Sequence, residues 1–257
     1  MTPEQFIKLG KDGYNHVPVV RTMFADMDTP LSCYVKVARG PYSYLLESAA
    51  QGGEKWARYS LVGLPSDCVV KITGDEITLE ESGEVTDQFR VEDPLAFVEE
   101  FQARYSYPEL QNLPIYTGGL VGYFGYDTIR YVEKKISQSA PPDTLGTPDI
   151  ILMVSNDVIV FDNVLGRIHL ITHADPAVDG SFDLAQARLQ QMTQDLQTNV
   201  PKDLHGPVRG PRLHEADFVS NYGEEAYKAD VEKIKDYIVE GDVMQVVLAQ
   251  RMSVAFE

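Results

Sequence analysis

The chain has 257 residues, of which 44% are hydrophobic, and a formal net charge of -17 at pH 7. This composition is typical of a folded protein with one large domain or two ordinary ones. The negative charge would repel nucleic-acid phosphates and anionic lipid, so neither nucleic acid nor a membrane is expected as a partner. Two cysteines, Cys33 and Cys68, are too few for a disulfide-stabilised secreted scaffold, which favours free thiols and a cytoplasmic location.

The first ninety residues are rich in strand patterns. We expect a short helix over residues 3–12, in a segment that lacks the apolar core of a signal peptide. A hairpin is expected over residues 76–89, because apolar and polar residues alternate there and Ser82 and Gly83 suit a turn. The other strand-like segments are 31–38, 41–50, 58–64 and 68–74.

The middle of the chain predicts helices and closely packed strands. Asp93 and Pro94 begin a helix, because Asp is a preferred N-cap and Pro at the first helical position loses no needed hydrogen bond. The glycine-rich segment 116–127 fits neither phosphate-loop nor dinucleotide-binding spacing and instead indicates close strand packing. A hairpin is expected within residues 148–173, and an amphipathic helix over residues 181–198.

A segment rich in Pro and Gly, residues 199–214, is predicted to link two parts of the chain. Residues 1–198 are expected to form one domain, and residues 215–257 the beginning of another. In the second part, Asn221 and Glu224 predict a capping box at the start of a helix. Because strands outnumber helices and hairpin signals are frequent, the predicted fold class is α+β, with mostly antiparallel sheets and flanking helices.

The segment "GDVMQVVLAQR", residues 241–251, predicts an apolar strand after a helix that Gly241 closes. The period of two places Gln245 on one face with Arg251 and small apolar residues. Burying an amide is unfavourable unless it is hydrogen-bonded, so Gln245 needs a partner. Neighbouring backbone, water and a ligand all remain open as that partner.

Glu47 and Ser48 lie where the apolar strand "SYLLESA" meets a Gly-rich loop, and Arg58 follows this loop. The carboxylate could bind an ammonium group and the guanidinium a carboxylate, which together suit a free amino acid. The alternative is a strand end with a solvated Glu47. The five histidines show no metal-ligand spacing, and no Ser-His-Asp arrangement can be argued. The residues alone therefore indicate an α+β protein with one or two small-molecule sites.

Seven segments, taken in chain order, resemble component I of anthranilate synthase: "DTPLSCYVKV", "YLLESA", "GGEKWARYSLVGL", "DPLAFVEEF", "GGLVGYFGYD", "PDIILMVSNDVIVFDN" and "YKADVEKIKDYIVEGDVMQVVLAQR". The resemblance implies that residues 1–198 form the family's N-terminal domain and that residues 215–257 begin its chorismate-binding domain. The family is a lyase of tryptophan biosynthesis that converts chorismate and ammonia to anthranilate and pyruvate with Mg2+. The resemblance also implies a hetero-oligomer with a glutamine amidotransferase, component II, and feedback inhibition by tryptophan.

The same resemblance assigns roles to individual residues. Ser48, with Leu46 and Glu47 beside it, falls in the tryptophan feedback pocket, and Arg58 falls near a basic position that lines this pocket. Gln245 falls where related isochorismate and salicylate synthases have a lysine that activates water. A lysine can act as a base when its pKa is lowered, whereas an amide can only orient a nucleophile. Gln245 is therefore expected to orient ammonia and to disfavour hydrolysis.

The sequence differs from the family by ending before the "PxAGT"-type motif, the Mg2+-binding glutamates and the catalytic histidine. We therefore expect a fragment that has no metal site or cofactor and is inactive alone. Two other functions compete. The large component of aminodeoxychorismate synthase, which serves folate synthesis, shares the fold and the glutamine, but "GGEKWARYSLVGL" fits anthranilate synthase better. The other is a non-catalytic, amino-acid-binding regulatory domain.

Overall fold

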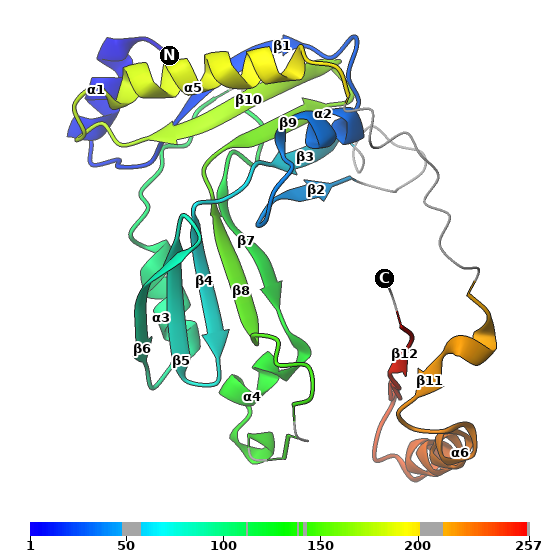
Figure 1. The fold of residues 1–257 in the computed structure, drawn as a ribbon. Coiled ribbons are helices and arrows are strands. Elements are labelled where there is room, and N and C mark those ends of the chain that lie inside the picture. The colour runs from blue at the N-terminus through cyan, green and yellow to red at the C-terminus, as the bar shows by residue number, and fades with distance from the viewer. Residues whose placement is uncertain (48–57, 112, 138, 141–142, 201–212, 256–257) are drawn as a thin grey trace. The chain divides into compact units, whose positions relative to one another are not determined.

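The computed structural model describes residues 1–47, 58–111, 113–137, 139–140, 143–200 and 213–255 (Figure 1). It divides into two compact units, Met1–Leu204 and His205–Glu257. Most of the predicted linker lies outside the described residues, so the domain boundaries stay a prediction.

The first unit contains two five-stranded sheets. Its helices and strands are α1 (Pro3–Lys11), β1 (Val17–Phe24), α2 (Pro30–Val37), β2 (Tyr44–Leu46), β3 (Tyr59–Gly63), β4 (Cys68–Thr73), β5 (Glu76–Glu81), β6 (Glu84–Arg90), α3 (Pro94–Gln102), β7 (Gly119–Phe124), α4 (Ile129–Val132), β8 (Ile150–Ser155), β9 (Val158–Asp162), β10 (Arg167–Ala174) and α5 (Ser181–Leu196). The strand orders are β1-β10-β9-β3-β2 and β6-β5-β4-β8-β7, and all described pairs are antiparallel. The predicted α+β class with mostly antiparallel sheets is confirmed.

Helix α5 covers one face of the first sheet, where it runs along β10 and β1 (Figure 1). Its buried residues are spaced three or four apart, as an amphipathic helix requires: Ala185, Leu189, Met192 and Leu196. They pack with Val17 and Val19 of β1 and with Ile168 and Leu170 of β10 in one core cluster. The helix predicted over residues 181–198 is confirmed.

The second sheet has its own core under α3. The Asp93 side chain accepts hydrogen bonds from the amides of Leu95 and Ala96, at 3.0 and 3.1 Å, so the predicted N-cap is present. Phe97 and Phe101 of α3 pack in the core cluster that contains buried residues of β4, β5 and β8. The predicted β5–β6 hairpin turns through two residues with positive φ, Ser82 and Gly83.

The glycine-rich segment forms β7, at the edge of this second sheet. A Cβ atom at Gly122 would lie 1.8 Å from the carbonyl oxygen of Ile151 on β8. No side chain can be accommodated at that distance, so glycine is needed for the close strand packing that the sequence indicates.

The strand predicted over residues 31–38 is wrong, because this segment is the helix α2. Thr29 caps it: the Thr29 hydroxyl accepts from the Ser32 amide at 3.1 Å, and the Ser32 hydroxyl accepts from the Thr29 amide at 2.9 Å. Pro30 occupies the first turn. The apolar run masked this capping signal, because the buried side of the helix includes Cys33, which is fully buried.

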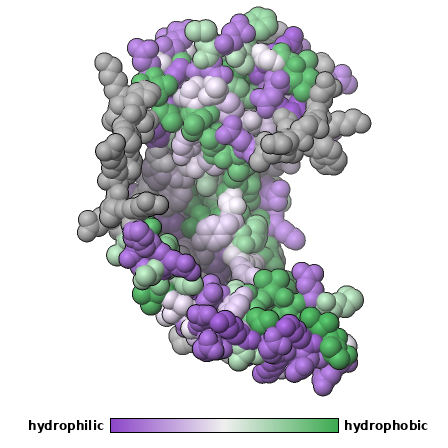
Figure 2. All heavy atoms as spheres, turned by 90° about the vertical axis from the view of Figure 1, so that its right-hand side faces the viewer, coloured by the Kyte–Doolittle hydropathy of each residue, from purple (hydrophilic) through white to green (hydrophobic). Residues whose placement is uncertain are grey.

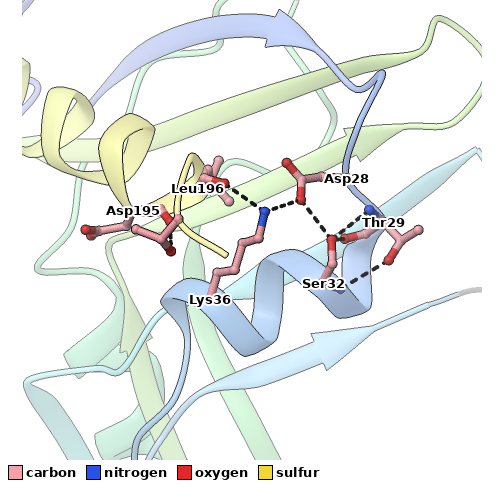
Figure 3. A network of polar contacts seen from close by, with 7 residues as sticks. Asp28, Thr29, Ser32, Lys36, Asp195 and Leu196 are labelled. Carbon is pink, nitrogen blue, oxygen red and sulfur yellow. Dashed lines mark hydrogen bonds and ion pairs between the residues drawn. The ribbon is translucent and has the colours of Figure 1, made fainter. Parts of the chain in front are cut away.

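A partly buried lysine, Lys36, joins α2 to the end of α5 (Figure 3). Lys36 Nζ donates to Asp28 Oδ1 at 2.7 Å and to the Leu196 carbonyl at 2.8 Å. The second bond satisfies a carbonyl at a helix C-terminus, where positive charge is favourable.

Burial and, to a smaller extent, Asp28 raise the pKa of the Cys33 thiol to about 12. This thiol is therefore protonated at neutral pH. Cys33 is a free cysteine, as the sequence predicts, and it is buried.

The second unit consists of β11 (Val219–Ser220), α6 (Glu224–Glu240) and β12 (Met252–Ser253). The predicted capping box at its helix is wrong. Gly223 is the N-cap, and Asn221 instead accepts from the Arg251 amide at 2.8 Å, which holds β11 beside β12. The predicted closure at Gly241 is confirmed by its left-handed φ of 83°.

The strand predicted over residues 241–251 is also wrong: this segment has no regular structure up to β12. A strand needs a neighbour that takes its backbone hydrogen bonds, and in the described residues none pairs with this segment. Met244 and Val247 are accordingly 98% and 82% exposed. Figure 2 shows hydrophobic residues among polar ones on the face that it draws.

Candidate functional site

A cavity of about 430 Å³ lies against β2, at the edge of the first sheet. Strand β2 pairs with β3 in the register Tyr44 to Gly63, and β3 pairs with β9. This pairing places β2 beside β3, with β9 on the other side of β3, and all three strands contribute residues to the cavity. The lining residues come from four segments: Leu45, Leu46, Glu47, Tyr59, Leu61, Pro114, Ile115, Tyr116 and Val160.

The cavity is apolar with one acidic group. Leu61 and Val160 lie opposite each other on β3 and β9, and two tyrosine rings, Tyr59 and Tyr116, supply flat surfaces. Glu47 is the one charged residue among the described residues that line it. A concave apolar site of this size with one polar anchor is typical of small-molecule pockets. An aromatic amino acid would place its ring among these side chains and its ammonium group at Glu47.

The structure brings two of the predicted pocket residues into this cavity. Leu46 is 50% exposed, and Glu47 is exposed beside it. Ser48 lies outside the described residues. The tryptophan-binding role of these three residues stays a prediction.

Arg58 is engaged by a buried carboxylate. Its Nε atom lies 3.1 and 3.2 Å from the two oxygens of Asp162, and its terminal nitrogen lies 2.7 Å from Oδ2. Hydrogen bonding to Arg58 holds the pKa of Asp162 below its usual range. The guanidinium also lies 4.8 Å from the centre of the Tyr59 ring, which lines the cavity. Arg58 is therefore next to the cavity, and its charge is shared with Asp162.

Replacement of Asp162 by alanine is expected to lower the free energy of unfolding by about 2–3 kcal/mol. The carboxylate is 2% exposed, and it accepts from Arg58 and from the amides of Val164 and Leu165 in the β9–β10 turn. Denaturant unfolding measures this loss. Asp75→Ala is the control, because the Asp75–Arg90 pair is exposed; we expect it to change stability by less than about 0.5 kcal/mol. Equal effects of the two substitutions would contradict the structural role given to Asp162.

The sequence-based reasoning missed Tyr116, Ile115 and Pro114. These residues precede β7 and carry no periodic pattern, so only the fold brings them to β2. The Tyr116 hydroxyl lies 3.0 Å from the Tyr44 hydroxyl, which in turn lies 2.7 Å from Oγ of Ser155.

A second cavity, of about 230 Å³, is lined by residues of β7, β8, β10 and the end of α3 and by His16, which precedes β1. Two histidines line it with their rings stacked: His16 and His173, with centres 4.2 Å apart and planes 7° from parallel. Burial and then the adjacent His173 lower the pKa of His16 to about 3. Burial also lowers the pKa of His173, whose Nδ1 lies 2.8 Å from the carbonyl oxygen of Asn156. Both rings are neutral at pH 7.

Gln245 belongs to the second unit, where it is exposed in the irregular segment after α6. The predicted face of small residues around it is absent, because the strand itself is absent. Its role toward a nucleophile stays a prediction.

The described residues contain no group of three or more His, Cys, Asp or Glu side chains that could hold a metal ion. Within the same part of the chain, no helix is long and apolar enough to cross a membrane.

The family model for chorismate binding enzymes matches residues 42–257, and the chain belongs to this family. Curated relatives named anthranilate synthase component 1 are 48% identical in Pseudomonas putida and 44% identical in Neisseria gonorrhoeae, each over all of this chain and 52% or 51% of the relative. A crystal structure of anthranilate synthase component I from Streptococcus pneumoniae TIGR4 is similar with a TM-score of 0.59 and 28% identity, over 91% of this chain and 49% of that one. The predicted resemblance is confirmed. The chain spans about half the length of the curated relatives it matches.

Proposed function

We propose that the chain is part of an anthranilate synthase component I, which converts chorismate and ammonia to anthranilate and pyruvate. The identity to relatives of that name along the whole chain supports this function. The observation that carries the regulatory part is the cavity on β2: Leu46 and Glu47 line it, in the segment where the resemblance expects a tryptophan pocket.

In this proposal, tryptophan binds in the cavity as a feedback inhibitor. The Glu47 carboxylate accepts hydrogen bonds from the ammonium group, and such charge-assisted bonds are about twice as strong as neutral ones. The indole ring packs among Leu61, Val160 and Tyr116, where apolar surface is removed from water. Ser48 and Arg58 complete the recognition of the amino-acid backbone.

The remaining parts of the proposal concern the whole enzyme. Ammonia comes from a glutamine amidotransferase, component II, in a hetero-oligomer, and Mg2+ assists chorismate binding. Gln245 orients ammonia by hydrogen bonds. A cytoplasmic location suits the two free thiols, Cys33 and Cys68.

The experiment measures anthranilate fluorescence with chorismate, ammonium and Mg2+. It uses the 257-residue chain and an extended chain, in which the 257 residues are joined to the C-terminal half of the Pseudomonas putida relative. We expect the extended chain to form anthranilate and tryptophan to inhibit it. Formation of aminodeoxychorismate without anthranilate would contradict the proposed reaction, and activity insensitive to tryptophan would contradict the proposed regulation.

Gln245→Lys in the extended chain should make water a competitor of ammonia. A lysine with a lowered pKa can take a proton from water, and an amide cannot. We expect a hydroxylated chorismate isomer beside a reduced yield of anthranilate, separated by chromatography. Gln250→Lys is the control for charge in the same segment. An unchanged product mixture for Gln245→Lys would contradict the role of the amide.

A further inference from the structure

Tyr116 is the shared wall of two cavities. Among the described residues, it is the one that lines both the 430 Å³ cavity on β2 and the 230 Å³ cavity beside His16 and His173. Its ring also packs against the buried cluster of Val158, Val160 and Ile171. The depth of the cavity on β2 therefore depends on the position of the Tyr116 side chain.

A chain of three hydroxyl groups holds Tyr116 in place. The hydroxyl of Tyr44 on β2 lies 3.0 Å from the Tyr116 hydroxyl and 2.7 Å from Oγ of Ser155, at the end of β8. Ser155 is 2% exposed. Burial raises the pKa of both tyrosines, so both keep their protons at neutral pH. The two bonds of this chain are donated by two of its three hydroxyls, and the partly buried setting makes each bond costly to lose.

The ring of Tyr44 is itself fixed by a glycine. Tyr44 pairs with Gly63 on β3, and a Cβ at Gly63 would lie 1.9 Å from the Tyr44 ring. The ring therefore lies on the bare backbone of β3, in the space that any side chain would fill. This packing fixes the position of the Tyr44 hydroxyl. The hydrogen bond between the two hydroxyls in turn fixes the position of the Tyr116 ring.

We propose that Tyr116 determines the size selectivity of the amino-acid cavity and that Tyr44 is its positioning residue. The inference rests on the proposed tryptophan pocket, which it deepens by naming what limits the ligand. With Tyr116 in place, an indole ring fills the cavity on β2, and longer aromatic side chains clash with the Tyr116 ring. Without the Tyr116 side chain, the two cavities join, and the smaller cavity accommodates the additional part of a longer ligand.

Calorimetry tests the proposal with two ligands, tryptophan and 5-benzyloxytryptophan, on both the 257-residue chain and the extended chain. Tyr116→Ala should shift the ratio of the two dissociation constants toward the larger ligand by at least about tenfold. Tyr44→Phe keeps the ring on Gly63 and should shift the ratio in the same direction by about threefold. Tyr123→Phe is the matched control, because the Tyr123 hydroxyl bonds the Pro148 carbonyl at 2.8 Å and lines neither cavity in the described residues. It should leave the ratio unchanged.

Equal weakening of both ligands by Tyr116→Ala would overturn the selectivity role. A merely structural role for Tyr44 would weaken both ligands alike and leave the ratio unmoved, which would overturn the positioning role. If no amino acid binds the parent protein, the proposed pocket fails, and the size selectivity fails with it.

A double-mutant cycle of Tyr44→Phe and Tyr116→Phe tests the coupling between the two tyrosines separately, without a ligand. The double variant should have an unfolding constant about fivefold smaller than additivity predicts, since both single changes break one shared bond. Additive effects would overturn the positioning role even if tryptophan binds.

Discussion

Acidification from pH 7 to pH 4 is expected to lower the free energy of unfolding by about 3 kcal/mol through His16 alone. The His16 ring is stacked on His173, and the Tyr105 ring packs edge-on at 5.1 Å. Burial and the adjacent imidazole lower the pKa of His16 to about 3, whereas an unfolded histidine titrates near its ordinary value of 6.5. Between these two values the unfolded chain binds the proton and the folded protein does not, so stability is present above pH 6.5 and is lost toward pH 3.

The other groups around the stack are consistent with this direction. Burial lowers the pKa of His173 as well, and the hydrogen bond to the Asn156 carbonyl and then the negative charge of Asp157 oppose this shift only in part. Protonation of either ring would place a charge beside a stacked neighbour and away from water.

The measurement is denaturant unfolding at pH 7, 5.5 and 4. His16→Phe keeps a ring on His173 and removes one titrating group, so the difference in stability between pH 7 and pH 4 should be about 3 kcal/mol smaller in this variant than in the parent protein. His214→Gln, at an exposed position in the second unit, is the control. An equal loss of stability with pH in His16→Phe and in the parent protein would show that the stack is not the source.

Leu189→Ala should lower the free energy of unfolding by about 3–4 kcal/mol, the second large effect that we expect. Leu189 is fully buried on the inner face of α5, where it packs in the core cluster that joins α1, α2, β1 and β10. Removing its side chain costs the transfer free energy of the lost carbons and leaves a cavity that this sheet cannot collapse to fill.

The same helix supplies the control. Leu184 is 69% exposed on the outer face of α5, so Leu184→Ala should change the free energy of unfolding by less than about 0.5 kcal/mol. Urea titrations followed by circular dichroism compare the two. Similar midpoints for both variants would contradict the placement of α5 on the sheet.

Local signals in the sequence predict the elements that depend on their own residues. The Asp93 cap, the turn at Ser82 and Gly83, and the apolar face of α5 need no distant partner, and the structure confirms all three. Helix α2 was missed because an apolar run hid the capping pair of Thr29 and Ser32. A short apolar run cannot by periodicity alone be told from a strand.

The strand predicted around Gln245 failed for a different reason. Its alternating residues suit a sheet, but a strand forms only beside another strand, and sequence periodicity does not supply one. In the described residues the segment remains irregular, and Met244 is almost fully exposed.

Some residues of the candidate site can be predicted from the sequence, and others are brought to it only by the fold. Leu46 and Glu47 are neighbours in the chain, and their residue types point to an amino-acid site. Tyr116 and Val160 reach the cavity only through the pairing of β2, β3 and β9. The capture of Arg58 by Asp162, 104 residues away, could not be read from the sequence either.

The most direct test of the tryptophan cavity is calorimetric titration of the extended chain with tryptophan, in the parent protein and in Glu47→Gln. We expect one tryptophan to bind per chain, and we expect Glu47→Gln to weaken binding at least about tenfold, because a neutral amide replaces the partner of the ammonium group. Glu84→Gln, an exposed change at the start of β6, should bind as the parent does. Absence of tryptophan binding in the parent, or equal affinity in Glu47→Gln and Glu84→Gln, would contradict the site.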